Sequence, residues 1–577
     1  MRYRQWGIRG LTFLALLIVA LIPLLPLILR GEYPLTHEKL RYAALTEYFQ
    51  TAILNGVWYP RWLPNLAGGY GYPTFVFYQP LFFFLTSFIE VSTGISPAIA
   101  CLTAIGVASF VGACGVYLLA RMRGSRPFSL LAGVLFLVTP YFFVDTYVRG
   151  DWSESLAMLL TPWPIYLALQ IQARVREGGF VTAQTLGFAV SLAAIIMSHP
   201  ATATGFCGCL ALFVAGVTLD LSTRENRVLY LKMTSIAILL GLVISSPYWE
   251  TVLRMRRYIP FETLTADYFA PSNHVVFPMQ LVSRYWGYGA SVVGKNDEMS
   301  FQLGSIHLVL ALAGLYAGRR DRKIWAAFVC YAILIVLMLP WARHTWDHVP
   351  ELTIMQFPWR LLSVIGIFQL YVTLGLARAG RPSIYPSLIL LLAMLVFQRQ
   401  NRDQFRLNPD TPAANKWSEL GQTMADQFAA DAQSTTTYAN INEFLPRTAE
   451  MPPEHRGTSV VEVTHGTVQP SSDSTDFKLD YQIDTDVPTS VLVRQFYFPG
   501  WRVELDNQAL SRETLERTLT PQGLMTVAVD SPGRHRLRAW YDGPPFSTVR
   551  NVFVVLISVF LTVVLFRFGR PRQSVAG

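Results

Sequence analysis

Apolar runs of about 20 residues recur along most of this 577-residue chain, and they constrain its fold more than any other feature. A helix of about 20 residues crosses the roughly 30 Å of hydrocarbon in a bilayer. Such runs lie at 11–29, 97–120, 128–145, 155–172, 182–198, 202–219, 231–249, 303–318, 324–340, 358–377, 384–398 and 549–566. The sequence therefore predicts a polytopic α-helical membrane protein of about 12 spans.

Basic residues predict the orientation of these spans, because short cytoplasmic loops carry an excess of Lys and Arg. Every alternate connection is basic, namely 2–9, 121–126, 174–176, 224–232, 319–323, 378–381 and 567–572. Both termini are then cytoplasmic, and residues 1–30 form an uncleaved first span. The net charge of +9 is interpreted as a topology signal, and no nucleic-acid-binding module is recognised. The apolar piece 78–91 is short, so we expect it to lie in or dip into the interface rather than to cross.

The predicted topology divides the chain into three parts. Residues 1–398 form a multispan domain with a first outer loop at 30–96, residues 399–548 form an extracytoplasmic domain, and residues 549–577 form the last span and a cytoplasmic tail. The other outward segments are 146–154, 199–201, 250–302 and 341–357. From Ser459 onward, short alternating segments with β-branched residues are separated by turn residues, which indicates a mostly β domain of the sandwich type.

Acidic residues lie in two of the outward segments. Glu38 follows the first span, and Asp145, Asp151 and Glu154 surround Arg149 in the stretch DTYVRGDWSE. Ionisable groups at membrane depth are costly and are usually paired or functional. We interpret Glu38 and Asp151 as catalytic candidates, and Asp151 with Glu154 as a candidate site for Mg or Mn that would neutralise a lipid phosphate. Two structural alternatives stay open: Thr36 could cap a helix whose first turn holds Glu38, and Asp151 could simply pair with Arg149.

Arginines on the same side depart from the usual inside bias and need a reason. Arg61, Arg149 and Arg360 all lie in or next to outward segments, and a guanidinium binds phosphate bidentately. The three arginines are therefore candidates for holding a lipid-linked phosphate. The alternative for Arg61 and Arg360 is snorkelling with stacking on the adjacent Trp62 and Trp359.

Two further groups complete the candidates. His37 and His199 are lone imidazoles without metal-ligand spacing, and we expect hydrogen-bonded loop residues, with His37 kept as a candidate for substrate binding. Tyr70 and Tyr72, in the turn-rich stretch GGYGYP, offer aromatic faces that suit a sugar as well as lipid.

Four stretches resemble a known family. They are YPRWLPNLAGGYGYPTFVFYQPL at 59–81, QFPWR at 356–360, NEFLP at 442–446 and FYFPGWRVELDN at 496–507. They resemble bacterial multispan proteins labelled 6-pyruvoyl-tetrahydropterin-synthase-related and their YfhO-like relatives. These families are regarded as similar to the C-type (GT-C) glycosyltransferases, multispan enzymes that use polyprenyl-phosphate sugars outside the membrane.

The resemblance implies an acidic residue in the first outer loop that acts as a base or a metal partner. By position this residue is Glu38, although His37-Glu38 stands where Asp is more usual and Glu is one methylene longer. The acidic group of the next outer loop would be Asp151, with Glu154 as an alternative.

Together these features predict a bacterial inner-membrane glycosyltransferase with an extracytoplasmic active face. It would move a sugar from a polyprenyl-phosphate donor to an extracytoplasmic glycan or lipid, in contact with membrane lipids. Two other functions stay open. A transporter or flippase for lipid-linked glycans would need charges deep in several spans, and the predicted spans are poor in them. A non-catalytic assembly factor would act through the β domain.

Overall fold

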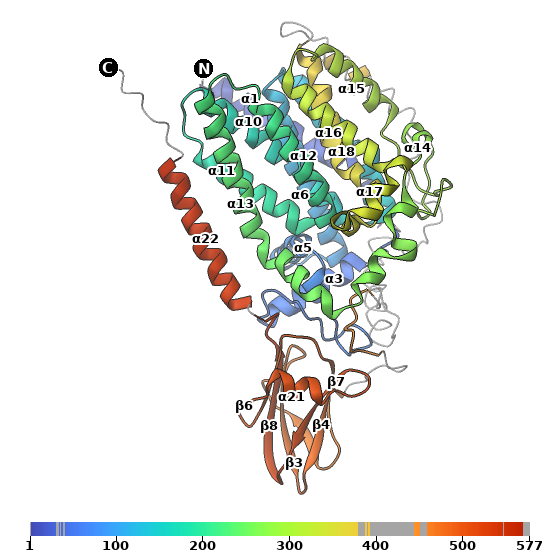
Figure 1. The fold of residues 1–577 in the computed structure, drawn as a ribbon, viewed down its shortest axis with the longest axis vertical. Coiled ribbons are helices and arrows are strands. Elements are labelled where there is room, and N and C mark those ends of the chain that lie inside the picture. The colour runs from blue at the N-terminus through green and yellow to red at the C-terminus, as the bar shows by residue number, and fades with distance from the viewer. Residues whose placement is uncertain are drawn as a thin grey trace.

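A helical bundle, two β-sheets and a final separate helix make up the protein in the computed structural model (Figure 1). The structure describes residues 2–30, 34, 36–38, 41–378, 387–388, 391–392, 443–450, 459–545 and 547–568. The predicted boundary at 398/399 lies outside these residues, and the division into three parts stays a prediction.

The helices of the first part follow one another with short connections. In chain order they are α1 (Arg2–Leu21), α2 (Leu25–Arg30), α3 (Arg41–Leu54), α4 (Thr74–Phe77), α5 (Leu81–Thr93), α6 (Pro97–Arg121), α7 (Arg126–Leu137), α8 (Pro140–Phe143), α9 (Trp152–Leu160), α10 (Pro162–Arg176), α11 (Thr182–Ser198), α12 (Pro200–Thr218), α13 (Arg224–Met255), α14 (Pro278–Val282), α15 (Ser305–Ala317), α16 (Arg322–Met338), α17 (Arg343–His348) and α18 (Leu362–Thr373). The last helix, α22 (Ser547–Phe568), follows the β-sheets.

The described residues contain 5 helices that are long and apolar enough to cross a membrane, or up to 7 if two bent helix pairs each count as one span. The bends are 49° between α7 and the segment Pro140–Arg149, and 79° between α16 and the segment Pro340–His348. The predicted count of 12 is therefore not confirmed. The difference arises because several apolar runs, such as those of α11 and α15, form helices shorter than 18 residues. Most of the apolar piece at 78–91 lies in the short helix α5, and its predicted position in the interface stays a prediction.

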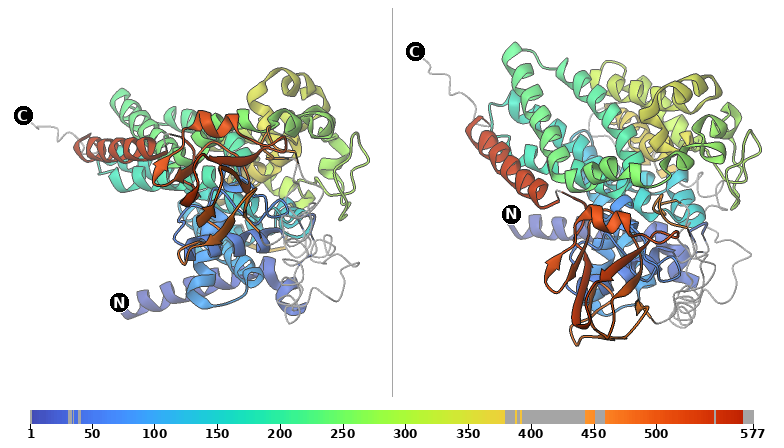
Figure 2. Two further views of the ribbon diagram at one scale, coloured as in Figure 1. Left: turned by 90° about the horizontal axis from the view of Figure 1, so that it is seen from below. Right: turned by 60° about the horizontal axis from the view of Figure 1, so that its bottom comes forward.

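The two ends of the bundle differ in what lies there. At one end the basic connections contact one another: Arg123 pairs with Asp321 at 2.8 Å, and Lys323 pairs with Asp220 at 3.2 Å. The opposite end carries the β-sheets, with α3 and α5 between them and the rest of the bundle (Figure 1). Seen from that end, the sheets cover only part of the bundle (Figure 2).

Helix α13 continues through an internal proline. Pro247 has no N–H, so the carbonyl of Val243 lacks its usual helical donor. The Ser246 hydroxyl donates to that carbonyl at 2.7 Å, and the Trp249 indole N–H donates to the Leu242 carbonyl at 2.9 Å. The Ser246 hydroxyl thus replaces the missing bond to Val243, and the Trp249 indole adds a contact in the preceding turn of the 32-residue helix.

The C-terminal β region has two antiparallel sheets, with strand orders β1-β4-β7 and β2-β3-β8-β5-β6. The strands are β1 (Val461–Val463), β2 (Thr467–Pro470), β3 (Lys478–Thr485), β4 (Thr489–Phe496), β5 (Trp501–Leu505), β6 (Gln508–Ala509), β7 (Leu524–Val529) and β8 (Gly533–Tyr541), with helix α21 (Arg512–Arg517) between β6 and β7. The alternation that predicted them buries one face, as Val491 and Val493 of β4 show. Asp506 and Asn507, both at positive φ, make the tight turn between β5 and β6.

The first loop of the bundle docks on this β region through one buried amide. Gln495 of β4 accepts a hydrogen bond from the Trp62 indole at 2.9 Å and donates to the carbonyls of Pro64 and Gly69. Gly71, at φ +86°, lies where a Cβ would collide with Gln495 and Trp62. The first loop is therefore held in one conformation by the β region.

Candidate functional site

Two loops that carry the predicted acids pair through their backbones. The His37 N–H donates to the Val148 carbonyl at 2.9 Å, and the Glu38 N–H donates to the Arg149 carbonyl at 3.1 Å. Gly150, at φ +77°, packs against Thr36 at a point where a Cβ would collide with the threonine side chain. The close approach therefore requires glycine, and it brings Glu38 beside the segment that carries Asp151.

A cavity of about 190 Å³ lies at this junction. All six segments predicted to face outward contribute to its lining, which includes Glu38, Arg41, Tyr78, Asp151, His199, Phe261, Gln356 and Glu443, with Arg360 at the start of the following span. Residues separated by as many as 400 positions in the sequence thus meet at one end of the bundle. This convergence is what the predicted topology requires of segments on one side of a membrane.

Glu38 is partly buried, with its side chain 30% exposed, and it accepts a hydrogen bond from Arg41 at 3.1 Å. Burial raises the pKa of Glu38 above its ordinary value, Arg41 opposes the rise, and the nearby Asp151 and Glu443 add to it. A raised pKa brings a carboxylate closer to neutral pH, where a general base works best.

Asp151 is fixed from several directions. Its side chain caps α9 by accepting from the Glu154 N–H at 3.2 Å, and it accepts from the Tyr42 hydroxyl at 2.8 Å. Burial alone would raise the pKa of Asp151, but interactions with His199 and Arg149 outweigh burial and hold that pKa below its ordinary value. Asp151 is therefore a fixed negative charge in the wall of the cavity.

Arg149 lies behind the cavity wall and contacts three carboxylates. Its guanidinium pairs with Asp145, with Glu154 and, at 3.2 Å, with Asp151, and it also donates to the Tyr141 hydroxyl at 3.0 Å. The short π-helical segment η2 (Val144–Arg149) brings Asp145 and Arg149 together. Asp151 does pair with Arg149, as one alternative proposed, and Arg149 is not among the residues that line the cavity. The assignment of Asp151 to catalysis and of Arg149 to phosphate binding stays a prediction.

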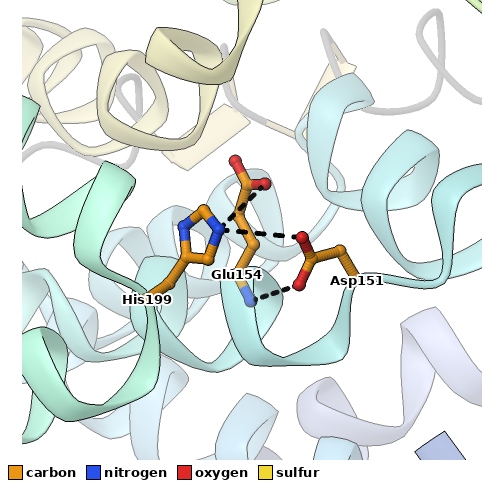
Figure 3. A group of neighbouring side chains, drawn as sticks. All are labelled: Asp151, Glu154 and His199. Carbon is orange, nitrogen blue, oxygen red and sulfur yellow. Dashed lines mark hydrogen bonds and ion pairs between the residues drawn. The ribbon is translucent and has the colours of Figure 1, made fainter. Parts of the chain in front are cut away.

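Asp151, Glu154 and His199 form a compact group (Figure 3). Each offers one ligand atom, and these atoms lie within 4.8 Å of one another, so the group could hold a metal ion. The His199 Nε2 atom lies 3.7 Å from Asp151 and 3.8 Å from Glu154. His199 was expected to be an ordinary loop residue, because it lies 48 positions beyond Asp151 without any metal-ligand spacing.

The atoms of this group that could bind a metal already contact other groups of the protein. The oxygens of Asp151 and Glu154 that face His199 also contact Arg149. The Nδ1 atom of His199 accepts from the Thr202 N–H at 3.2 Å, which leaves the proton of the neutral ring on Nε2. A metal ion would therefore bind only after Arg149 and the Nε2 proton gave way, so the residues as arranged do not fit one.

Arg360 has its guanidinium beside the cavity. It donates to the Gln356 side chain at 3.0 Å, while Gln356 in turn donates to the Leu264 carbonyl at 3.0 Å. Gln356 has φ +57°, a strained value for a residue other than glycine, and such strain persists where surrounding contacts enforce it. The Arg360 Nε atom is buried and makes no hydrogen bond among the described residues, and it lies 3.8 Å from the Glu154 carboxylate as an ion pair.

Arg41 is a second cavity arginine, which the sequence interpretation overlooked. It contacts Glu38 at 3.1 Å and Glu443 at 3.8 Å, and its guanidinium lies over the Tyr78 ring at 4.9 Å. Its Nε atom is also buried without a hydrogen bond in the described part of the chain. The signal was its position three residues after Glu38, which the turn before α3 brings within reach of the Glu38 carboxylate.

The other predicted binding residues do not line this cavity. Tyr70 and Tyr72 are buried, 3% and 1% exposed, and contact Phe496 and Phe444 near the β region. Arg61 stacks on the Tyr59 ring at 3.9 Å. His37 is exposed, and its ring contacts the Tyr288 carbonyl at 2.9 Å. Their assignment to substrate binding stays a prediction.

Comparisons with known proteins find a family but no curated relative. A sequence model of the 6-pyruvoyl-tetrahydropterin synthase related domain, a membrane protein, matches residues 75–402. No curated protein sequence matches the chain.

Three solved structures illustrate the structural likenesses. The oligosaccharyltransferase of Archaeoglobus fulgidus is 13% identical, with 74% of this chain and 60% of that chain covered and a TM-score of 0.41. The arabinofuranosyltransferase AftD from Mycobacteria is 16% identical over 71% of this chain and 28% of that chain, with a TM-score of 0.41. ArnT from Cupriavidus metallidurans, solved bound to undecaprenyl phosphate, is 14% identical over 74% and 71% of the two chains, with a TM-score of 0.43. The chain thus spans less than two thirds of the first two proteins, and all three TM-scores lie below 0.5.

Proposed function

This chain belongs to the 6-pyruvoyl-tetrahydropterin synthase related family of membrane proteins, and we propose that it is a membrane glycosyltransferase. Its donor is a sugar carried on polyprenyl phosphate, and its acceptor is a glycan or lipid at the extracytoplasmic face of a bacterial inner membrane. One observation supports the proposal: the segments predicted to face outward meet at a cavity that combines a carboxylate of raised pKa with two arginines, Arg41 and Arg360.

The reaction assigns one role to each group. Glu38 takes the proton of the acceptor hydroxyl, and the acceptor oxygen forms a bond to the anomeric carbon of the sugar. The bond between that carbon and the phosphate oxygen breaks, and polyprenyl phosphate leaves with the electron pair. Arg360 and Arg41 hold the phosphate and stabilise the charge that develops on it.

Asp151 and His199 prepare the site rather than exchange protons with substrate. The fixed charge of Asp151 raises the pKa of Glu38 and faces the sugar, where a positive charge develops as the glycosidic bond breaks. Burial lowers the pKa of His199, so its ring is neutral at pH 7. No step needs a metal; Mg or Mn at Asp151, Glu154 and His199 would have to displace Arg149.

The decisive experiment incubates the purified full chain in lipid vesicles with a panel of radiolabelled polyprenyl-phosphate sugars and an extract of cell-envelope glycans. We expect one donor to release its sugar to an acceptor, and we expect EDTA to leave the rate unchanged. Movement of intact donor between leaflets without sugar release would favour a flippase and contradict the proposal. Loss of transfer on chelation that Mn²⁺ restores would show that the metal-bound arrangement is the active one.

A further inference from the structure

A groove of about 660 Å³ runs between α13 and α22 on the outer surface of the bundle. Its walls are mostly apolar, with Leu239, Leu242 and Val243 from α13 facing Val552, Phe553 and Leu556 from α22. Figure 1 shows α22 standing apart from the rest of the bundle along this side of α13. In a bilayer such a groove is filled by hydrocarbon chains, because water gains nothing from apolar walls.

The groove has a charged end. Arg550 donates to Glu250 at 3.1 Å and also to Thr251, while Arg254 pairs with the other oxygen of Glu250. Two guanidinium groups thus face one carboxylate, and one positive charge remains. The Arg254 side chain is 62% exposed, so part of its guanidinium is open to a ligand.

The length of the groove matches one leaflet. The step from Leu239 to Glu250 covers about 16 Å along α13, at 1.5 Å per residue, which is about half of the hydrocarbon thickness. Trp249 lines the groove beside the charged groups, at the level where indole rings favour the headgroup region. The charged groups lie at the end of the bundle that carries the β-sheets, where Pro545 precedes α22.

We infer that this groove binds one anionic glycerophospholipid. Its phosphate lies against Arg254, supported by Arg550, and one acyl chain lies between α13 and α22. The remaining positive charge favours a headgroup of net negative charge, because the cationic amine of a zwitterionic headgroup would be repelled by the guanidinium groups that bind the phosphate. The length of a single leaflet favours an acyl chain over a much longer polyprenyl chain.

The position of the groove gives the lipid a structural role. It fills the space between the last helix and the bundle, and the last helix follows directly from the β region. The opposite face of the same α13 turns carries Tyr248 and Val252 in the lining of the cavity, and the Tyr248 hydroxyl donates to the Phe77 carbonyl at 3.1 Å. The lipid is therefore one helix away from the cavity, and the inference is independent of the proposed reaction.

Native mass spectrometry of the full chain, stripped of lipid and then titrated with phosphatidylglycerol, tests this site. We expect wild type to retain one tightly bound phosphatidylglycerol. The variant Val552→Trp should lose this lipid, because the indole fills the groove. Val552 is 55% exposed, so the larger side chain meets no core. Val309→Trp on α15, at a position 64% exposed and outside the groove, is the matched control and should keep the lipid.

The headgroup is tested separately with Arg254→Gln, a substitution at an exposed side chain. One lost charge-assisted contact should weaken retention of phosphatidylglycerol about tenfold and leave the binding of neutral diacylglycerol unchanged. Arg517→Gln, at a position 76% exposed in the β region, is the control. Equal retention by Val552→Trp and wild type would overturn the site. Equal retention of diacylglycerol and phosphatidylglycerol by wild type would contradict recognition of the headgroup. Preference for polyprenyl phosphate would contradict the assignment of the groove to a glycerophospholipid.

Discussion

Replacement of Glu38 by Gln should lower the rate of sugar transfer by about 100- to 10,000-fold, the usual contribution of a general base. The amide keeps the size of the side chain and can still accept a hydrogen bond from Arg41, which contacts Glu38 at 3.1 Å. Only the ability to take a proton is lost. The measurement is the release of radiolabelled sugar from the donor identified in the panel, with donor binding followed in parallel.

Two further variants make this result specific. Glu351→Gln, at an exposed acid of the segment η8 (Pro350–Met355) at the same end of the bundle, removes a charge without touching the cavity and should keep full activity. Glu38→Asp keeps the charge but retracts it by one methylene, so partial activity is expected. Undiminished transfer by Glu38→Gln would remove Glu38 from the mechanism even if the protein proved to be an enzyme.

The pH dependence of transfer follows from the same residue. Burial raises the pKa of Glu38 above 4.5, and a base works only when ionised. The rate should therefore fall as the pH drops through this raised pKa, at a pH higher than an exposed glutamate would give.

Replacement of Arg149 by Met should destabilise the protein by about 3–5 kcal/mol, because it removes one partner from a buried ionic network. Asp145 and Glu154 are fully buried, and Asp151 is nearly so, and all three lose their shared counter-charge at once. The measurement is a denaturant titration in mixed micelles. Arg517→Met, which removes an exposed arginine from a helical pair in the β region, should change stability by less than about 1 kcal/mol.

A double variant separates loss of charge balance from loss of packing. Adding Asp145→Asn to Arg149→Met removes one of the uncompensated charges, so it should recover part of the lost stability. Arg149→Lys keeps the charge but lacks the forked guanidinium that reaches three carboxylates. Its stability should therefore lie between that of Arg149→Met and that of wild type. If Arg149→Met were as stable as wild type, the network would not hold this wall of the cavity together.

Sequence patterns predicted the parts of this protein that depend on composition. The alternation of basic connections placed Glu38, Asp151 and Arg360 on one side, and the structure brings all three to one cavity. Period-2 alternation likewise predicted the strands that hold Val491 and Leu537, which are buried. The alternation of basic connections and the period-2 alternation of apolar residues each depend on many residues. A contact made by any one residue therefore does not change what they predict.

Individual partners were not predictable in the same way. Whether Arg149 faces a phosphate or three carboxylates depends on the π-helical turn at Val144–Arg149, which leaves no mark in the sequence. Tyr70 and Tyr72 carry the same aromatic signal whether they face a sugar or the β region. His199 reaches Asp151 only because α11 and α9 pack together, and neither spacing nor composition encodes that contact.

Glu443 and Phe444 belong to the stretch before the β-sheets, yet they line the same cavity as Glu38. Gln495, within the sheets, holds the backbone of the first loop at Pro64 and Gly69. The β region and the segment before it are therefore both in contact with the parts of the bundle that form the cavity. A chimera that took this region from a relative would lose the contacts of Gln495 with the first loop, so we expect the first loop and the β region to be exchangeable only together.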